Sequence, residues 1–173
     1  MKFISIAKED IGIQQTIFQS YTTSFPEDER RDNIQFLELF SHPAVKVFSI
    51  EVGADAIGYL ITWMLNDVVF IEHFEVFEAF RNKKYGSQIL QDFSKMFPRL
   101  VLESEPSDLN DLAARRIAFY QRNHFEIIDT DYLQPAYSTG KNSLHLFLLS
   151  NCKIDKTNDL VNEIHATVYA NLK

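Results

Sequence analysis

Three strand-like segments follow one another between residues 45 and 77, with no helical segment between them. The stretches VKVFSIEV, AIGYLITWML and DVVFIEHFEVF are rich in β-branched and aromatic residues, and a tight turn at Gly53-Ala54-Asp55 joins the first two. Consecutive strands joined by such turns pair side by side and antiparallel. This block therefore predicts a sheet with an antiparallel centre, around which the other segments must pack.

Apolar residues at helical intervals lie both before and after these three strand-like segments. Apolar residues recur at helical intervals from Ile11 to Phe40, and the capping-box pair Ser24 and Glu27, with Pro26 between them, predicts a second helix from that point. Later helices are predicted over about residues 85–97 and 110–122, and further strands at KFISIA, RLVLESE, FEII and SLHLFLL.

The C-terminal tail carries Leu160, Ile164, Val168 and Leu172 at four-residue spacing, which predicts a terminal amphipathic helix. The order β-α-α-β-β-β-α-β-α-β-β-α predicts an α/β fold with a mixed, mostly antiparallel central sheet flanked by helices. We expect one domain over residues 1–150. Residues 151–173 are expected to pack on that domain or at an interface, such as that of a homodimer.

The composition narrows the function classes. The 173 residues carry a formal net charge of −7 and no broad basic stripe, so nucleic acid is not an expected partner. No apolar run approaches the length of a membrane span, and the N-terminus lacks a signal peptide's apolar region. With a single Cys152, these features favour a cytoplasmic protein. No histidine pair at i, i+4 spacing and no cysteine pair is present, so no metal site is expected.

The stretch FEVFEAFRNKKYGSQILQDF, from Phe74 to Phe93, concentrates positive charge at the start of a predicted helix. Arg81, Lys83 and Lys84 lie within four positions, and Gly86 follows them. The first N–H groups of a helix have no partner within it, and the helix dipole favours anions there. Because glycine also allows a ligand to approach the backbone closely, we predict an anion site that fits a pyrophosphate. The alternative is a solvated basic turn. Neither G-x-x-x-x-G-K-[ST] nor G-x-G-x-x-G is present.

Two motifs carry a resemblance to a known family. Residues 81–86, Arg-Asn-Lys-Lys-Tyr-Gly, are similar to the signature (Q/R)-x-x-G-x-(G/A), with Lys84 in place of the first glycine. RRIAFYQRNHFEII is similar to a helix followed by YxxxGF, with His124 where glycine is usual. Over about residues 1–150 the chain thus resembles the GNAT superfamily of acetyl-CoA-dependent N-acetyltransferases, in its bacterial-type branch.

The resemblance implies acetyl-CoA as cosubstrate. Arg81 and the N–H groups near Gly86 would hold the pyrophosphate of coenzyme A, and the strand edge at Phe74 to Val76 would pair with the pantetheine arm. In this superfamily the two central strands separate beyond that point. The N–H near Val76 would stabilise the oxyanion. The implied coenzyme-binding residues are Phe74, Glu75, Val76, Arg81, Asn82, Lys83, Lys84, Tyr85, Gly86 and Ser87.

Acyl transfer to an amine needs a base for the ammonium and an acid for the leaving thiolate. Tyr120 occupies the family's general-acid position. Glu72, four residues before Val76, is expected as the general base, with Glu103 or Glu105 as the alternative. His73 alternates to the opposite strand face from Glu72, which does not favour a catalytic role.

By family position, Phe25, Tyr132 and Tyr137 are candidate walls of the acceptor pocket, and Glu103 and Glu105 candidate contacts for a cationic acceptor. The expected activity is direct transfer of an acetyl group from acetyl-CoA to a primary amine. An antibiotic, a polyamine, an amino acid and a protein N-terminus all remain open as acceptor. A catalytically silent acyl-CoA sensor and an interaction protein without a ligand are the alternative functions.

Overall fold

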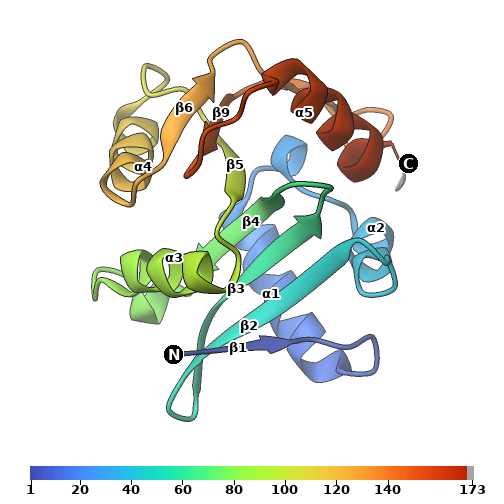
Figure 1. The fold of residues 1–173 in the computed structure, drawn as a ribbon. Helices are drawn as coiled ribbons and strands as arrows, with labels where there is room; N and C mark the ends of the chain where they lie inside the picture. The colour runs from blue at the N-terminus through green and yellow to red at the C-terminus, as the bar shows by residue number, and fades with distance from the viewer. Residues whose placement is uncertain (171–173) are drawn as a thin grey trace.

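The computed structural model describes residues 1–170, and its centre is a seven-stranded sheet. The strand order is β1-β2-β3-β4-β5-β9-β6, with β4 and β5 the one parallel pair in this sheet (Figure 1). Its strands are β1 Lys2–Ser5, β2 Val45–Val52, β3 Asp55–Met64, β4 Val69–Val76, β5 Leu100–Ser104, β6 Glu126–Asp129 and β9 Phe147–Ser150. The predicted mixed, mostly antiparallel sheet is confirmed.

Helices cover both faces of this sheet. The helical segments are α1 Ile11–Ser24, η1 Glu27–Glu29, α2 Asn33–Leu39, η2 Glu78–Phe80, α3 Tyr85–Met96, α4 Asp111–Arg122, α5 Thr157–Ile164 and the π-helical turn η3 His165–Tyr169. One core cluster joins α1, α2 and α5 to the sheet through residues such as Ile17, Phe36 and Ile164. A second cluster contains Ile89 of α3 and Ile117 of α4. None of the described helices combines the length and apolar content that a membrane span requires.

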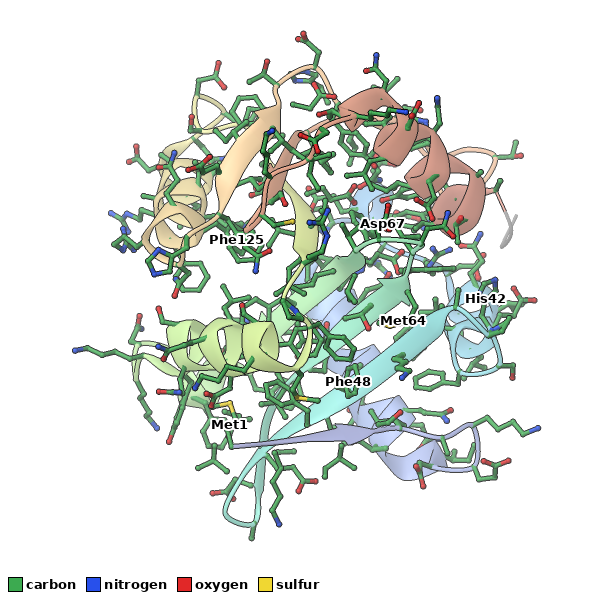
Figure 2. The ribbon with its side chains drawn as sticks, viewed as in Figure 1. Met1, His42, Phe48, Met64, Asp67 and Phe125 are labelled. Atoms are coloured by element: carbon green, nitrogen blue, oxygen red, sulfur yellow. The ribbon has the colours of Figure 1, made fainter. Side chains whose placement is uncertain are left out.

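The strands contribute side chains to both core clusters, because successive side chains point to opposite faces of the sheet. On β2, Val47 belongs to the cluster beneath α1, while Phe48 belongs to the cluster beneath α3. Figure 2 labels Phe48 on β2. Its ring centroid lies 5.6 Å from that of Phe93 in α3. The apolar runs of the sequence are thus buried on both sides of the sheet.

Two element boundaries differ from the sequence-based prediction. Helix α1 ends at Ser24, and α2 begins at Asn33 behind a capping box formed by Asp32 and Gln35, so the box predicted at Ser24 and Glu27 is wrong. The single strand predicted at SLHLFLL is two short strands, because the chain changes partner within it. Strand β8 (Leu144–His145) pairs with β7 (Leu133–Gln134), whereas β9 pairs with β5 and β6.

The C-terminal segment packs on the sheet. Leu160, Ile164 and Val168 of the predicted apolar stripe are buried, while Leu172 lies outside the described residues. Beyond Ile164 the helix widens into the π-helical turn, which brings Tyr169 into the core as well.

Strands β4 and β5 separate near their middle. They pair only where Val69–Ile71 meets Leu100–Leu102; beyond this, β4 continues along β3 and β5 along β9. Figure 1 shows the result, with β1 to β4 in the lower half of the view and β5, β9 and β6 in the upper half. A parallel pair that opens in this way leaves one edge of β4 without a strand partner.

Candidate active site

A cavity of about 300 Å³ lies where β4 and β5 separate. It is lined by Ser24, Phe25, Glu29, Ile71, Glu72, His73, Phe74, Glu75, Val76, Arg81, Leu102, Glu103, Ser104, Glu105, Arg116, Tyr120, Gln134 and Leu146. The cavity therefore brings together the predicted Tyr120 with Glu72 and both of its alternatives.

A β-bulge in β4 sets the direction of its polar side chains. Ile61 of β3 pairs with His73 and Thr62 with Ile71, which leaves Glu72 as the extra residue. Glu72 and His73 consequently point to the same side, against the expectation that they alternate. His73 packs its ring 4.8 Å from that of Tyr21 in α1.

Glu72 is held in a buried hydrogen-bond network. Its Oε1 lies 2.8 Å from the Arg31 guanidinium and accepts from the Tyr137 hydroxyl at 2.9 Å, and its Oε2 accepts from Trp63 Nε1 at 2.7 Å. Burial acts to raise the pKa of Glu72, but Arg31, His73 and the hydrogen bonds from Trp63 and Tyr137 together outweigh it and hold the pKa below its usual value. A carboxylate with both oxygens engaged and a lowered pKa is a weak proton acceptor. The structure therefore argues against Glu72 as the general base.

Glu103, unlike Glu72, has no cationic partner within the described residues. Its Oε1 accepts a 2.5 Å hydrogen bond from the Tyr169 hydroxyl, and its buried Oε2 has no hydrogen-bond partner among the described residues. Burial raises the pKa of Glu103 to about 8, and the hydroxyls of Tyr169 and Tyr132 oppose that rise only in part. A base is most useful when its pKa lies near the working pH. Glu103 thus has both the free oxygen and the proton affinity that Glu72 lacks.

Tyr120 is positioned by the end of α4. The N–H of His124 donates to Gln121 O at 3.1 Å and the N–H of Phe125 donates to Tyr120 O at 3.1 Å, which together form a Schellman motif. Phe125 also packs its ring 5.9 Å from that of Tyr120. Burial raises the pKa of Tyr120, and its hydroxyl makes no hydrogen bond within residues 1–170. A protonated hydroxyl without a partner, facing the cavity, can donate to a ligand.

These features can be compared with known proteins. A model of the acetyltransferase (GNAT) family matches residues 13–125. The chain belongs to the GNAT acetyltransferase family. No match was found among curated proteins.

Three solved structures illustrate the likeness. A GNAT-family acetyltransferase from Bacteroides thetaiotaomicron is 28% identical, with 98% of each chain covered and a TM-score of 0.91. An IAA acetyltransferase from Bacillus cereus is 15% identical, with 86% of this chain and 97% of that chain covered at a TM-score of 0.58. A GNAT-family acetyltransferase from Elizabethkingia anophelis, solved with acetyl-CoA bound, is 19% identical, with 69% and 82% covered at a TM-score of 0.50.

Both departures from the GNAT motifs keep the backbone shape of the glycine they replace. Lys84 has φ +64° and His124 has φ +67°, in the left-handed region that favours glycine. Asn82 adds a third such residue at φ +62°. Since Lys84 occupies the N-cap position of α3 without a side-chain cap, the loop ends with the helix N-terminus open.

Of the groups expected to bind an anion at this N-terminus, the backbone N–H groups are free within residues 1–170, whereas the Arg81 side chain is already bonded within the protein. The backbone N–H groups of Tyr85, Gly86 and Ser87 make no hydrogen bond within the described residues. Arg81 is engaged elsewhere, because its Nε donates to Val76 O at 2.9 Å and its guanidinium lies 3.0 Å from Glu75.

The side chains of two further residues expected to bind the coenzyme also form hydrogen bonds within the protein. Lys83 donates to Ala79 O at 3.0 Å. The Glu75 carboxylate, buried in the cavity wall, accepts from Ser20 at 2.9 Å and Ser24 at 2.6 Å.

Gly86 has a packing reason that the sequence did not reveal. A Cβ at this position would lie 3.1 Å from the ring of Phe119 on α4. Gly86 therefore allows α3 to approach Phe119, whereas the sequence-based interpretation linked it only to a ligand.

A second groove, of about 520 Å³, runs between α3 and the end of α4. It is lined by Lys84, Ser87, Gln88, Gln91, Ser94, Arg122, Asn123, His124 and Asn151. None of these lining residues is acidic, in a chain with a net charge of −7. A groove with basic and amide side chains and no carboxylate suits an anionic ligand.

The predicted acceptor residues divide into two groups. Phe25 and Glu105 line the cavity with Glu103, and Glu105 forms a 2.8 Å salt bridge to Arg116. Tyr132 and Tyr137 are buried in the core and do not belong to the cavity lining.

Other residues of the site were not predicted. Arg31 lies in the run ERRD, which reads as a solvated charged segment, yet its side chain is 1% exposed. Tyr169 could have been suspected, because it is a hydroxyl-bearing ring next to Val168 of the buried stripe. Glu29 and Ser104 were not singled out as individual residues.

Proposed function

We propose that the protein is an N-acetyltransferase that moves an acetyl group from acetyl-CoA to a primary amine by direct transfer. The observation that carries the proposal is the cavity between β4 and β5, in which Glu103 has a raised pKa and a free oxygen and Tyr120 has a free hydroxyl. The two groups supply the base and the acid that aminolysis of a thioester needs.

The coenzyme part of acetyl-CoA has a matching surface. The unpaired N–H groups at the start of α3 suit the pyrophosphate, and the acid-free groove beside them suits the remaining phosphate and the nucleotide. Lys84 and Arg122 in that groove form no salt bridge within the described residues, so their charges are available. The unpaired edge of β4 suits the pantetheine arm.

The proposed transfer assigns one proton step to each group. Glu103 takes a proton from the ammonium, and the free amine nitrogen forms a bond to the thioester carbonyl carbon. An N–H near Val76 stabilises the oxyanion. The carbon–sulfur bond then breaks, and Tyr120 gives its proton to the departing thiolate. The nitrogen of the adduct gives its remaining extra proton to the Tyr120 phenolate, which leaves a neutral acetamide and restores the tyrosine. The products are an acetamide and the free thiol of coenzyme A.

Thiol release from acetyl-CoA in the presence of primary amines tests this function. Tyr120→Phe keeps the ring and removes the hydroxyl, so we expect kcat to fall by about 10² to 10⁴ while packing is retained. Calorimetric titration with acetyl-CoA serves as the control and should give similar affinity for both proteins. Thiol release at the wild-type rate by Tyr120→Phe would remove the tyrosine from the mechanism. Coenzyme binding without transfer to any amine would favour the acyl-CoA sensor instead.

A further inference from the structure

The cavity contains more carboxylates than its own cations neutralise. Five acidic residues line it, and three of these have a close cationic partner. The pairs are Glu72 with Arg31 at 2.8 Å, Glu75 with Arg81 at 3.0 Å and Glu105 with Arg116 at 2.8 Å. The other two, Glu29 and Glu103, form no salt bridge within residues 1–170.

The charge of one unpaired carboxylate, Glu29, acts on the other, Glu103. Burial raises the pKa of Glu29, with a further contribution from Glu105, and the Glu29 charge contributes to the raised pKa of Glu103. A cavity in which one carboxylate raises the proton affinity of another is a site at which positive charge is favoured. Glu29 lies on η1 at the cavity wall, where its backbone carbonyl O is 2.9 Å from His73 Nε2.

Other buried polar atoms in the wall also lack a partner. His73 and Ser104 are 4% and 5% exposed, and their Nδ1 and Oγ atoms form no hydrogen bond within the described residues. A carbonyl oxygen only accepts, so His73 Nε2 carries the proton and Nδ1 is left as an acceptor. These atoms are therefore available to a ligand in the cavity that can form hydrogen bonds with them.

The unpaired atoms determine what that ligand must offer. Glu29, His73 Nδ1 and Glu103 in the ionised form that serves as base all accept hydrogen bonds, and an ammonium group has three donors and no acceptor. Both cations of the lining, Arg81 and Arg116, are already paired with carboxylates. A carboxylate or phosphate on the acceptor would therefore enter an acidic cavity without a free cation to bind it.

We propose that the acceptor is a small diamine, whose reacting nitrogen lies at Glu103 and whose second, protonated nitrogen binds Glu29. This inference rests on the proposed acetyl transfer and specifies its substrate class. It separates a diamine from an amino acid, which carries a carboxylate, and from a simple monoamine, which leaves Glu29 unpaired.

Three acceptors with the same carbon chain test the inference: 1,4-diaminobutane, butylamine and 4-aminobutanoate. We expect kcat/KM for thiol release to be at least about tenfold higher with the diamine than with butylamine, as for a charge-assisted hydrogen bond. The value for 4-aminobutanoate should be below that for butylamine. The comparison of diamine with monoamine is repeated with 1,3-diaminopropane, 1,5-diaminopentane and the monoamines of the same chain length. This covers the case in which the site requires another distance between the two nitrogens.

Glu29→Gln should lower the ratio of diamine to monoamine kcat/KM at least fivefold. Glu27→Gln, an exposed residue of the same short helix, is the matched control and should leave the ratio unchanged. Equal kcat/KM values for diamine and butylamine at every length, or a preference for 4-aminobutanoate, would overturn the inference.

Binding separates this inference from the proposed function. Calorimetric titration of 1,4-diaminobutane and of butylamine into the complex with coenzyme A requires no turnover, and the diamine should bind at least about tenfold more tightly. If the protein acetylates amines without this preference, the diamine inference is wrong and the proposed acetyltransferase function still stands. If coenzyme A does not bind, the proposed function fails, and the same titrations on the free protein decide the diamine preference by the same ratio.

Discussion

Two glutamates on neighbouring strands show how strongly local partners decide chemistry. Glu72 receives a guanidinium and two further hydrogen bonds, whereas Glu103 receives one hydroxyl. The first is therefore stabilised as a carboxylate and the second as a neutral acid at moderate pH. The distinction depends on Arg31, which is far from Glu72 in the sequence and has no counterpart beside Glu103 within the described residues.

The raised pKa of Glu103 makes stability depend on pH. The folded protein holds this proton up to about pH 8, whereas an unfolded glutamate releases it near pH 4.5. Stability from this group is fully present below pH 4.5 and is lost as pH rises through 8, by about 1.4 kcal/mol for each pH unit in the window. Glu103→Gln cannot ionise, so its melting temperature relative to wild type should rise across this window.

Melting curves recorded at intervals from pH 4 to 9 check this prediction. Glu126→Gln, at an exposed position on β6, is the control and should show a constant difference from wild type. A constant difference for Glu103→Gln as well would mean that Glu103 ionises normally.

At the scale of elements, the end of α4 fixes both the turn and Tyr120. His124 occupies the C′ position of the Schellman motif at φ +67°, where glycine carries no steric penalty. Its neighbour Asn123 has φ −101° and donates from its side chain to Phe119 O at 2.8 Å. The motif therefore predicts opposite effects of glycine at two adjacent positions.

We expect His124→Gly to stabilise the protein by roughly 0.5 to 1 kcal/mol, because it relieves the left-handed conformation of a residue with a Cβ. The melting temperature should rise by about 1 to 4 °C. Asn123→Gly should lower it, since it loses a hydrogen bond and gains chain entropy in the unfolded state. Thermal denaturation measures both, and a lower melting temperature for His124→Gly would contradict this account of the turn.

The elements were predictable where periodicity governs them, as in β2, β3 and α3, whose apolar residues fill both faces of the sheet. The direction of His73 was not, because the bulge at Glu72 shifts the alternation by one residue. The start of α2 was missed because the sequence analysis placed the capping box at Ser24 and Glu27. In the structure Asp32 and Gln35 form the box, and the Ser24 hydroxyl donates to Glu75 instead.

At the scale of the whole molecule, the C-terminal segment completes the site. Tyr169 bonds to Glu103, and Val168 O accepts a 2.8 Å hydrogen bond from Arg31, which also holds Glu72. The sequence predicted an amphipathic helix here, and its spacing shows which face is buried. It could not show what that face contacts, because a hydrogen bond between residues 66 positions apart leaves no local pattern.

Our central claim is that Glu103 accepts the proton in acetyl transfer, and the pH dependence of kcat/KM tests it most directly. This profile reports ionisations of the free enzyme and the free amine. For wild type we predict a rise with an apparent pKa near 8, separate from that of the amine near 10. Tyr169→Phe removes a hydrogen bond that lowers the Glu103 pKa, so it should move the first pKa upward. A profile that follows the amine alone, identical in wild type and Tyr169→Phe, would contradict the claim.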